Sequence, residues 1–152
     1  MPTEAEAEYS TRAGTVTRRF YGETDELLEK YCWFAHNSFG VVQPSGTLKP
    51  NDLGFFDSMG NVLEWNQNTF DFDARVRFET GRLVDDIEDA LDQSANPSGN
   101  PIFRVQRGGS VMNSRYQIYS AARDEYSLMD EEDSYVGFRV ACTIAVVPSP
   151  AD

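Results

Sequence analysis

Two different periods of hydrophobic residues run along the chain, and each predicts its own kind of element. A four-residue period near the N-terminus predicts a short helix from Glu4 to about Arg12. Thr3 and Glu6 have the spacing of a capping box that would begin this helix, and Gly14 is suited to end it. The residues of the apolar stripe are Ala5, Tyr9 and Ala13.

The four-residue period returns in an acidic block at residues 71–93. Within this block, leucine and isoleucine repeat every four residues, and aspartate and glutamate fill most positions between them. The pattern predicts an amphipathic surface helix with a narrow apolar face. The repeating apolar positions are Leu83, Ile87 and Leu91.

A two-residue period predicts short strands in the second half of the chain. Residues 102–107 alternate and end at two glycines, and residues 116–124 and 135–147 predict two further strands. Residues 31–65 instead hold short aromatic and aliphatic runs broken by Asn, Ser, Gly and Pro, which predicts irregular but packed loops. Together these elements indicate an α+β fold with much ordered loop.

Composition and charge favour a folded domain and exclude several partners. The 152 residues are 40% hydrophobic and 12% aromatic, which is richer in large apolar side chains than a disordered chain. Twenty-five acidic residues against 13 basic ones give a net charge of −12, which would repel nucleic acids and anionic membranes. No run approaches the roughly 20 apolar residues of a membrane span, and no signal peptide is evident. We therefore expect a cytoplasmic protein by default.

Few residues suited to metal binding or nucleophilic catalysis are present. Cys32 and Cys142 are too far apart in the sequence for a local metal motif, and His36 is the single histidine. Free cysteines are often buried, so we interpret both as packed thiols. One disulfide between them remains an alternative if the protein is secreted.

Six short motifs then occur in a fixed order along almost the whole chain. They are PTEAEAEYSTRAG (2–14), NSFG (37–40), KPNDLGFFDSMGNVLEW (49–65), RGGS (107–110), AAR (121–123) and GFRVA (137–141). This series resembles the sulfatase-modifying-factor family, whose best-known members are formylglycine-generating enzymes. The resemblance runs from residue 2 to about residue 144.

The resemblance implies a C-type-lectin-like fold of the formylglycine-generating-enzyme type, rich in loops, with short strands and few helices. The same resemblance implies two structural arginines, Arg123 and Arg139, which would tie loops to the core, since five fixed donors suit several carbonyls at once. It also implies four aromatic core anchors, at Tyr9, Phe55, Trp65 and Phe138.

The sequence departs from the family at the residues that carry its chemistry. The resemblance implies copper held by two cysteines shortly after Gly-Gly-Ser, but Asn113 stands where the first cysteine is expected and no second one follows before Ala121. An amide is a hard ligand and does not replace a pair of thiolates around soft copper(I). We therefore expect no copper, no catalytic residue and no formylglycine-generating activity.

A second departure concerns the extent of the domain. The resemblance places the start of this chain about half-way through the family domain. We expect a truncated gene, a wrongly chosen start codon, or a partner chain that supplies the missing N-terminal half. The sulfoxide-synthase branch of the family would also require an iron-binding helical domain on the N-terminal side.

The resemblance also implies a candidate calcium site in the GNVLEW loop. Its ligands would be the side chains of Asp57 and Glu64 and the carbonyls of Gly60 and Val62. Calcium takes six to eight oxygens, and two carboxylates seven residues apart around a Gly-Asn turn can supply several of them. The alternative is that Asp57 caps a turn and Glu64 pairs with an arginine.

The sequence therefore predicts one sulfatase-modifying-factor-like domain at residues 1–145, with a flexible tail at 146–152. The preferred function is a non-catalytic binding or structural module with an unknown protein or small-molecule ligand. One alternative is an oxidoreductase of the same family, formylglycine-generating or sulfoxide-synthase-like, whose metal site is completed by a missing N-terminal region or a partner. The other alternative is an inactive truncated fragment.

Overall fold

A computed structural model describes residues 1–69, 104–124 and 133–142 of the chain. The acidic helix predicted at residues 71–93 and the tail predicted at 146–152 lie outside these residues. Within the described ranges, no helix is both long and apolar enough to cross a membrane.

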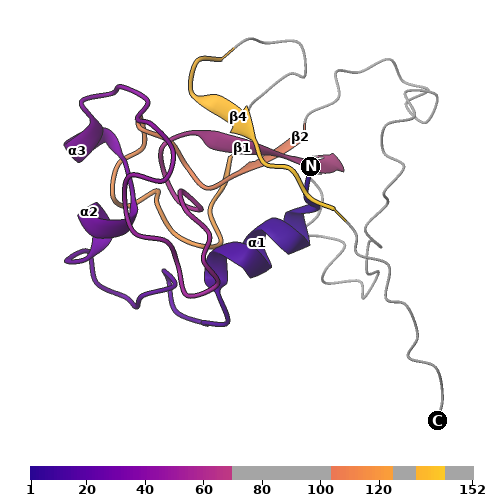
Figure 1. Ribbon diagram of the computed structural model, residues 1–152, viewed down its shortest axis with the longest axis horizontal. Helices are drawn as coiled ribbons and strands as arrows, with labels where there is room; N and C mark the ends of the chain where they lie inside the picture. Colours follow the sequence, from indigo (N-terminus) through magenta and orange to yellow (C-terminus); the bar gives the residue numbers. More distant parts are fainter. Residues whose placement is uncertain (70–103, 125–132, 143–152) are drawn as a thin grey trace, which may run out of the picture.

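A four-stranded sheet forms one side of the molecule, with strand order β3-β2-β1-β4. The inner strand β1 pairs antiparallel with β2 and parallel with β4, and β2 pairs antiparallel with β3. The helix α1 lies against the sheet. Much of the remaining chain winds through long loops on the side of the molecule away from the sheet (Figure 1). The strands are β1 (Leu63–Thr69), β2 (Arg104–Arg107), β3 (Arg123–Asp124) and β4 (Val136–Phe138).

The predicted N-terminal helix is confirmed as α1 (Glu4–Arg12). Its capping box is formed as expected, with the Glu6 N–H donating to Thr3 Oγ1 at 3.2 Å and the Thr3 N–H donating to a Glu6 carboxylate oxygen at 2.8 Å. The helix ends at Arg12 as predicted, but the left-handed residue that follows it is Ala13 (φ 49°), one position before the predicted Gly14.

The side of α1 that faces the sheet is its charged side. Arg107 of β2 pairs with Glu4 at 3.0 Å and also with Glu8, and Arg123 of β3 pairs with Glu4 at 2.5 Å. The backbone N–H of Glu4 donates to Asn68 Oδ1 of β1 at 2.6 Å. Ion pairs therefore dock this helix, and part of its apolar stripe is left facing outward.

This arrangement corrects the expectation of four aromatic core anchors. Tyr9 and Phe138 are each 70% exposed and Phe55 is 36% exposed, while Trp65 is partly buried. Tyr9 is displaced because the acidic face of α1 occupies the contact with the sheet. Arg139 and Arg123 are likewise part-exposed struts, whereas among the described arginines Arg19 is fully buried and Arg104 and Arg107 nearly so.

The hydrophobic core lies among the loops. Two short helices, α2 (Leu28–Tyr31) and α3 (Ala35–Ser38), contribute to it or border it. The cluster is completed by aromatic side chains that meet edge to face, such as Phe20 and Tyr31 with ring centroids 5.0 Å apart. Its buried members are Phe20, Leu28, Cys32, Phe34, Met59 and Ile118.

Gly60 explains why the 49–65 motif passes so close to this core. A Cβ at this position would lie 2.3 Å from Cys32 Sγ and 2.3 Å from the Trp33 carbonyl oxygen, and φ is +76°. The absent side chain lets the Gly60 N–H donate to the Gly108 carbonyl at 2.8 Å and the Asn61 N–H to the Trp33 carbonyl at 2.8 Å. Three separate loops are joined at this one point.

The strand predictions are partly wrong. Residues 104–107 form a strand as expected, but only Arg123–Asp124 of the predicted 116–124 strand does so, and only Val136–Phe138 of the described part of 135–147. Leu63–Thr69, which belonged partly to the predicted loop region, is one of the two inner strands of the sheet. The sequence pattern did not predict this strand because polar residues lie inside it. Asn66, for example, is buried, although amides are rare inside strands.

Candidate functional site

A polar pocket of about 340 Å³ lies where the family places its cysteine pair. Gly109, which follows β2, forms one wall of the pocket, and β3 forms the other. The loop between them supplies most of the lining side chains. The lining residues are Leu63, Gly109, Asn113, Tyr116, Gln117, Tyr119, Ala122, Arg123 and Asp124. We call this the Asn113 pocket.

Asn113 acts as a structural residue at the position expected for the first cysteine. Its Oδ1 accepts the backbone N–H of Ser110 at 2.7 Å and the Ser110 hydroxyl at 3.1 Å. Its backbone carbonyl accepts the N–H of Ala35 at 3.1 Å. Because Ser110 is buried, the Asn113 amide satisfies groups that water does not reach.

Two neighbouring arginines hold the loop that lines this pocket. The fully buried Arg19 donates from Nε to the Ile118 carbonyl at 2.9 Å and from Nη2 to the Arg115 carbonyl at 2.7 Å. Arg18 donates from Nη2 to the Tyr116 carbonyl at 2.8 Å, and its guanidinium carbon lies 5.6 Å from the ring centroid of Tyr119. The loop is therefore fixed through its backbone carbonyls, and side chains such as Tyr116 (70% exposed) are free to meet a ligand.

Sequence reasoning missed this role of Arg18 and Arg19. The two residues precede their loop partners by almost one hundred positions, and no pattern along the chain connects the segments. The only local signal is a pair of arginines directly before an aromatic pair, Phe20 and Tyr21. That signal alone does not distinguish a buried strut from a surface charge.

The chemistry of the Asn113 pocket suits hydrogen bonding and stacking. Its phenol, amide, guanidinium and carboxylate groups can both donate and accept hydrogen bonds. In the described part of the chain, no group of three or more His, Cys, Asp or Glu side chains is placed to hold a metal ion. The residues that line the pocket include no cysteine, so they do not offer the soft sulfur ligands of the copper that the family resemblance implies.

The two cysteines lie in different surroundings, and neither is in a disulfide. Cys32 is buried in the core, and burial raises the pKa of its thiol far above the usual range. Cys142 is exposed beyond β4, where it lines a second pocket, so the interpretation of both cysteines as packed thiols is wrong for Cys142. The disulfide alternative is thus not formed in this structure.

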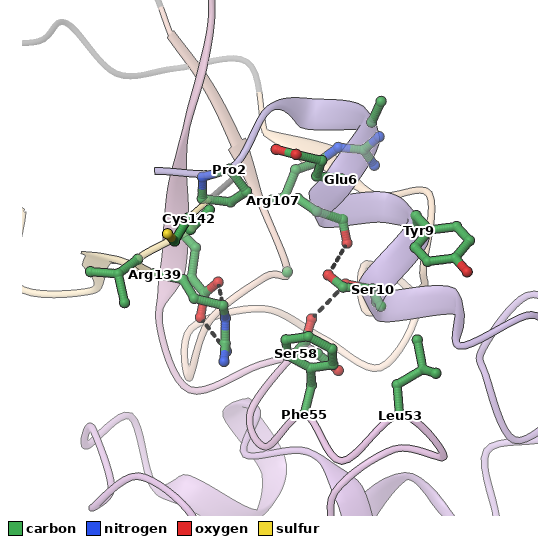
Figure 2. A pocket seen from close by; sticks show the side chains of 17 residues that line it. Pro2, Glu6, Tyr9, Ser10, Leu53, Phe55, Ser58, Arg107, Arg139 and Cys142 are labelled. Atoms are coloured by element: carbon green, nitrogen blue, oxygen red, sulfur yellow. Dashed lines mark hydrogen bonds and ion pairs between the residues drawn. The ribbon is translucent and has the colours of Figure 1, made fainter. Parts of the chain in front are cut away.

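The second pocket is larger, about 540 Å³, and lies beside α1. The outward apolar face of α1, the loop at residues 53–58 and the segment at 139–142 surround it (Figure 2). Figure 2 shows Tyr9, Leu53, Phe55 and Cys142 among its lining side chains. At its polar end, Arg139 donates from Nε and Nη2 to the two carboxylate oxygens of Glu64, at 2.9 and 2.7 Å.

The four candidate calcium ligands have other contacts or are spread along the loop. Glu64 is engaged with Arg139, and Asp57, which has a left-handed backbone (φ 52°), accepts the Gly46 N–H on Oδ2 at 2.8 Å. Gly60 contributes a turn at which the chain crosses Trp33, and Val62 directly precedes β1. These are the contacts that the sequence left open as the alternative to calcium, and calcium binding stays a prediction.

Comparison with known proteins agrees with the family resemblance of the six sequence motifs. A family model for the sulfatase-modifying factor enzyme 1-like domain matches residues 1–144. Formylglycine-generating enzyme from Mycobacterium tuberculosis is 29% identical over 153 residues, covering 91% of this chain and 49% of that protein. The enzyme of the same name from Bos taurus is 28% identical over 160 residues, covering 93% of this chain and 38% of that protein.

A solved structure of similar fold is Treponema denticola variable protein 1. It superimposes with a TM-score of 0.66 and 26% identity, and the match covers 91% of this chain and 45% of that one. The predicted C-type-lectin-like α+β fold with few helices is thereby confirmed. The chain spans half or less of the length of the relatives it matches.

Proposed function

The chain belongs to the sulfatase-modifying factor enzyme 1-like family, and on this basis we propose that it is a non-catalytic binding module, not a formylglycine-generating enzyme. Its ligand would bind in the Asn113 pocket. The observation that carries the proposal is the use of the Asn113 side chain as an internal hydrogen-bond acceptor for Ser110.

The Asn113 contacts support the proposal for two chemical reasons. The amide oxygen is a hard ligand that is already engaged, whereas copper(I) requires soft sulfur ligands. The thiols are not gathered here either, since Cys32 is buried in the core and Cys142 lines the other pocket. Asn113 therefore has a structural role at the position where a thiolate would be needed.

The construction of the loop supports binding as the remaining role of this site. Arg18 and Arg19 fix the backbone of residues 115–118, so this loop is preorganised and loses less conformational entropy when a ligand binds. Exposed Tyr116 and Gln117 supply a flat aromatic surface and amide donors and acceptors. This chemistry fits a polar ligand with hydrogen-bonding groups.

The test is an assay for formylglycine. The purified chain, loaded with copper under reducing conditions, would be incubated with a cysteine-containing sulfatase peptide in air, and the peptide would be analysed by mass spectrometry. Formylglycine-generating enzyme from Mycobacterium tuberculosis is the positive control. We expect no conversion by this chain and none by its Asn113→Cys variant, whereas copper-dependent conversion by the unmodified chain would refute the proposal.

We further propose calcium at Asp57 and Glu64 as a separate property of the same module. Its support is chemical, because two carboxylates and nearby carbonyls on one loop are the oxygen ligands that calcium uses. Against it, both oxygens of Glu64 face Arg139, so the ion would have to replace a guanidinium.

A further inference from the structure

An aromatic side chain projects almost fully into solvent directly after α3. Phe39 is 89% exposed, and Val41 and Val42 that follow it are 59% and 40% exposed. Met112, from the loop after β2, is 55% exposed, and its sulfur would lie 3.6 Å from a Cβ built on Gly40. Phe39, Val41 and Val42 are thus exposed around Gly40, with Met112 beside it, and we call these four side chains the Phe39 face.

The backbone of Phe39 is held in a conformation that bulky residues avoid. Its φ is 57°, in the left-handed region, where a side chain larger than that of glycine is disfavoured. Such a conformation persists only where the surrounding structure imposes it, and it is concentrated at functional sites. Burial of the ring does not explain it, because the ring is exposed.

Hydrogen bonds at both ends impose this conformation. The buried Ser38 accepts the Gly40 N–H on Oγ at 3.2 Å and the Val41 N–H on its carbonyl at 3.1 Å. At the other end, Asn61 and Gln43 exchange two bonds, from Gln43 N–H to Asn61 Oδ1 at 2.9 Å and from Asn61 Nδ2 to the Gln43 carbonyl at 3.0 Å. The turn is consequently a preorganised support for an exposed ring.

The two segments that supply the Phe39 face differ in charge from the rest of the chain. Residues 34–43 and 110–119 contain none of the 25 acidic residues of the chain and a single cation, Arg115. Their net charge is +1, which leaves −12 − 1 = −13 on the rest of the chain. Within the described ranges the exposed Arg115 guanidinium has no hydrogen-bond or ion-pair partner. Glu29 lies beside the first segment, with a carboxylate oxygen 3.8 Å from His36 Nε2, and Arg115 is the cation that these two segments offer to a carboxylate of a partner.

We propose that the Phe39 face docks a partner protein, which packs apolar side chains on Phe39 and Met112 and places a carboxylate at Arg115. Protein interfaces are enriched in aromatic residues, Met and Arg and depleted in Asp and Glu. Aromatic and Arg side chains often supply most of the binding energy at such interfaces. A second copy of this chain is a poorer occupant because both copies carry −12. None of these residues lines either pocket, so the inference does not depend on the proposed function.

The experiment is a selection from a displayed random peptide library on the immobilised full chain. Its matched variant is Phe39→Gly, which removes the ring and accepts the left-handed backbone. Val16→Gly is the control, because Val16 is 96% exposed and lies elsewhere. Peptides that combine an aromatic or leucine residue with Asp or Glu are expected, with affinity reduced about tenfold or more by Phe39→Gly and unchanged by Val16→Gly.

Three further readouts decide the matter. Arg115→Glu is expected to weaken the acidic peptides as strongly as Phe39→Gly does. Because the ring strains the turn, Phe39→Gly is expected to raise the melting temperature by roughly 2–4 °C. The inference is overturned if no peptide is enriched, if selected peptides bind Phe39→Gly as well as the parent, or if sedimentation reveals a dimer that Phe39→Gly dissociates.

Discussion

The Arg139 guanidinium donates two hydrogen bonds to the Glu64 carboxylate, from Nε at 2.9 Å and from Nη2 at 2.7 Å. Nη2 also donates to the Phe56 carbonyl at 2.9 Å. One arginine thereby joins β1, the segment after β4 and the loop at residues 53–58. Bidentate pairs of this kind are among the stronger ion pairs in proteins, and this one occupies a carboxylate that the family resemblance assigned to calcium.

Calcium binding and the ion pair predict different responses of the melting temperature to calcium. If Asp57 and Glu64 bind the ion, calcium raises the melting temperature of chelator-treated protein, since a ligand bound only to the folded state stabilises it, and Glu64→Gln abolishes the rise. Scanning calorimetry with calcium, with magnesium as the control ion, and with chelator measures this. A melt that calcium does not change in the parent protein ends the calcium hypothesis.

The buried guanidinium of Arg19 is expected to be essential for stability. It donates to three backbone carbonyls, of Ile118, Thr24 and Arg115, and pairs with the half-exposed Asp25 at 2.7 Å. Arg19→Met would leave these acceptors buried without donors, at a cost of about 2 kcal/mol or more in free energy of unfolding. Urea denaturation measures this.

Arg19→Lys provides the discriminating comparison for that prediction. A single ammonium cannot reach three carbonyls in the fixed geometry of a guanidinium, so we expect a loss close to that of Arg19→Met. Exposed Arg115, changed to Met, should alter the free energy of unfolding by less than about 0.5 kcal/mol. Full retention of stability by Arg19→Lys would show that charge alone matters here.

Gly60→Ala is expected to be severely destabilising. Its new methyl group would lie 2.3 Å from both Cys32 Sγ and the Trp33 carbonyl oxygen, at a φ of +76°, so we expect a loss of roughly 3 kcal/mol or more. Gly54→Ala is the matched control, because Gly54 also has a positive φ (+85°) but nothing within 4 Å. Its loss should be only about 1 kcal/mol. Equal losses of stability in the two variants would show that the close approach of Gly60 to Trp33 does not cause the destabilisation.

Stability is expected to fall at alkaline pH because of Cys32. Burial raises the pKa of this thiol in the folded protein, while in the unfolded chain it titrates near about 8.5. Above that pH the unfolded state binds fewer protons than the folded state, so the free energy of unfolding decreases by up to about 1.4 kcal/mol per pH unit. Below it, the contribution of the neutral thiol is fully present.

Cys32→Ala isolates this effect from other titrating groups. The variant should be less stable than the parent near neutral pH, because it leaves a space in the core, and the difference should shrink between about pH 8 and 10. Urea denaturation across this range is the measurement. A difference that stays constant with pH would contradict the assignment of the alkaline loss to Cys32.

The helix α1 shows how far local sequence determines structure in this protein. Thr3 and Glu6 bond to each other's backbone across three residues, so the start of the helix depends on contacts that the sequence itself contains. The same sequence left the helix orientation open. Tyr9 belongs to the apolar stripe but faces outward, because Arg107 and Arg123 draw the acidic face of α1 onto the sheet.

The loop at residues 114–120 shows where local pattern misleads. Alternation around Ile118 predicted a strand, and Ile118 is indeed fully buried. The carbonyls of Arg115, Tyr116 and Ile118, however, accept from Arg18 and Arg19 instead of a neighbouring strand. A buried side chain every second residue is compatible with a strand and with an irregular loop. Only the source of the hydrogen-bond donors to the backbone carbonyls distinguishes the two.

The sequence by itself determined the family, through six motifs in order, the N-terminal helix with its cap, and the absence of the cysteine expected at Asn113. These follow from residue identity and from contacts only a few positions apart. The tertiary structure decided which acid meets which arginine, which aromatic rings are exposed, and that Phe39 rather than Tyr9 stands on a strained turn. Burial and charge pairing are settled by partners distant in sequence, so their outcome depends on the whole fold.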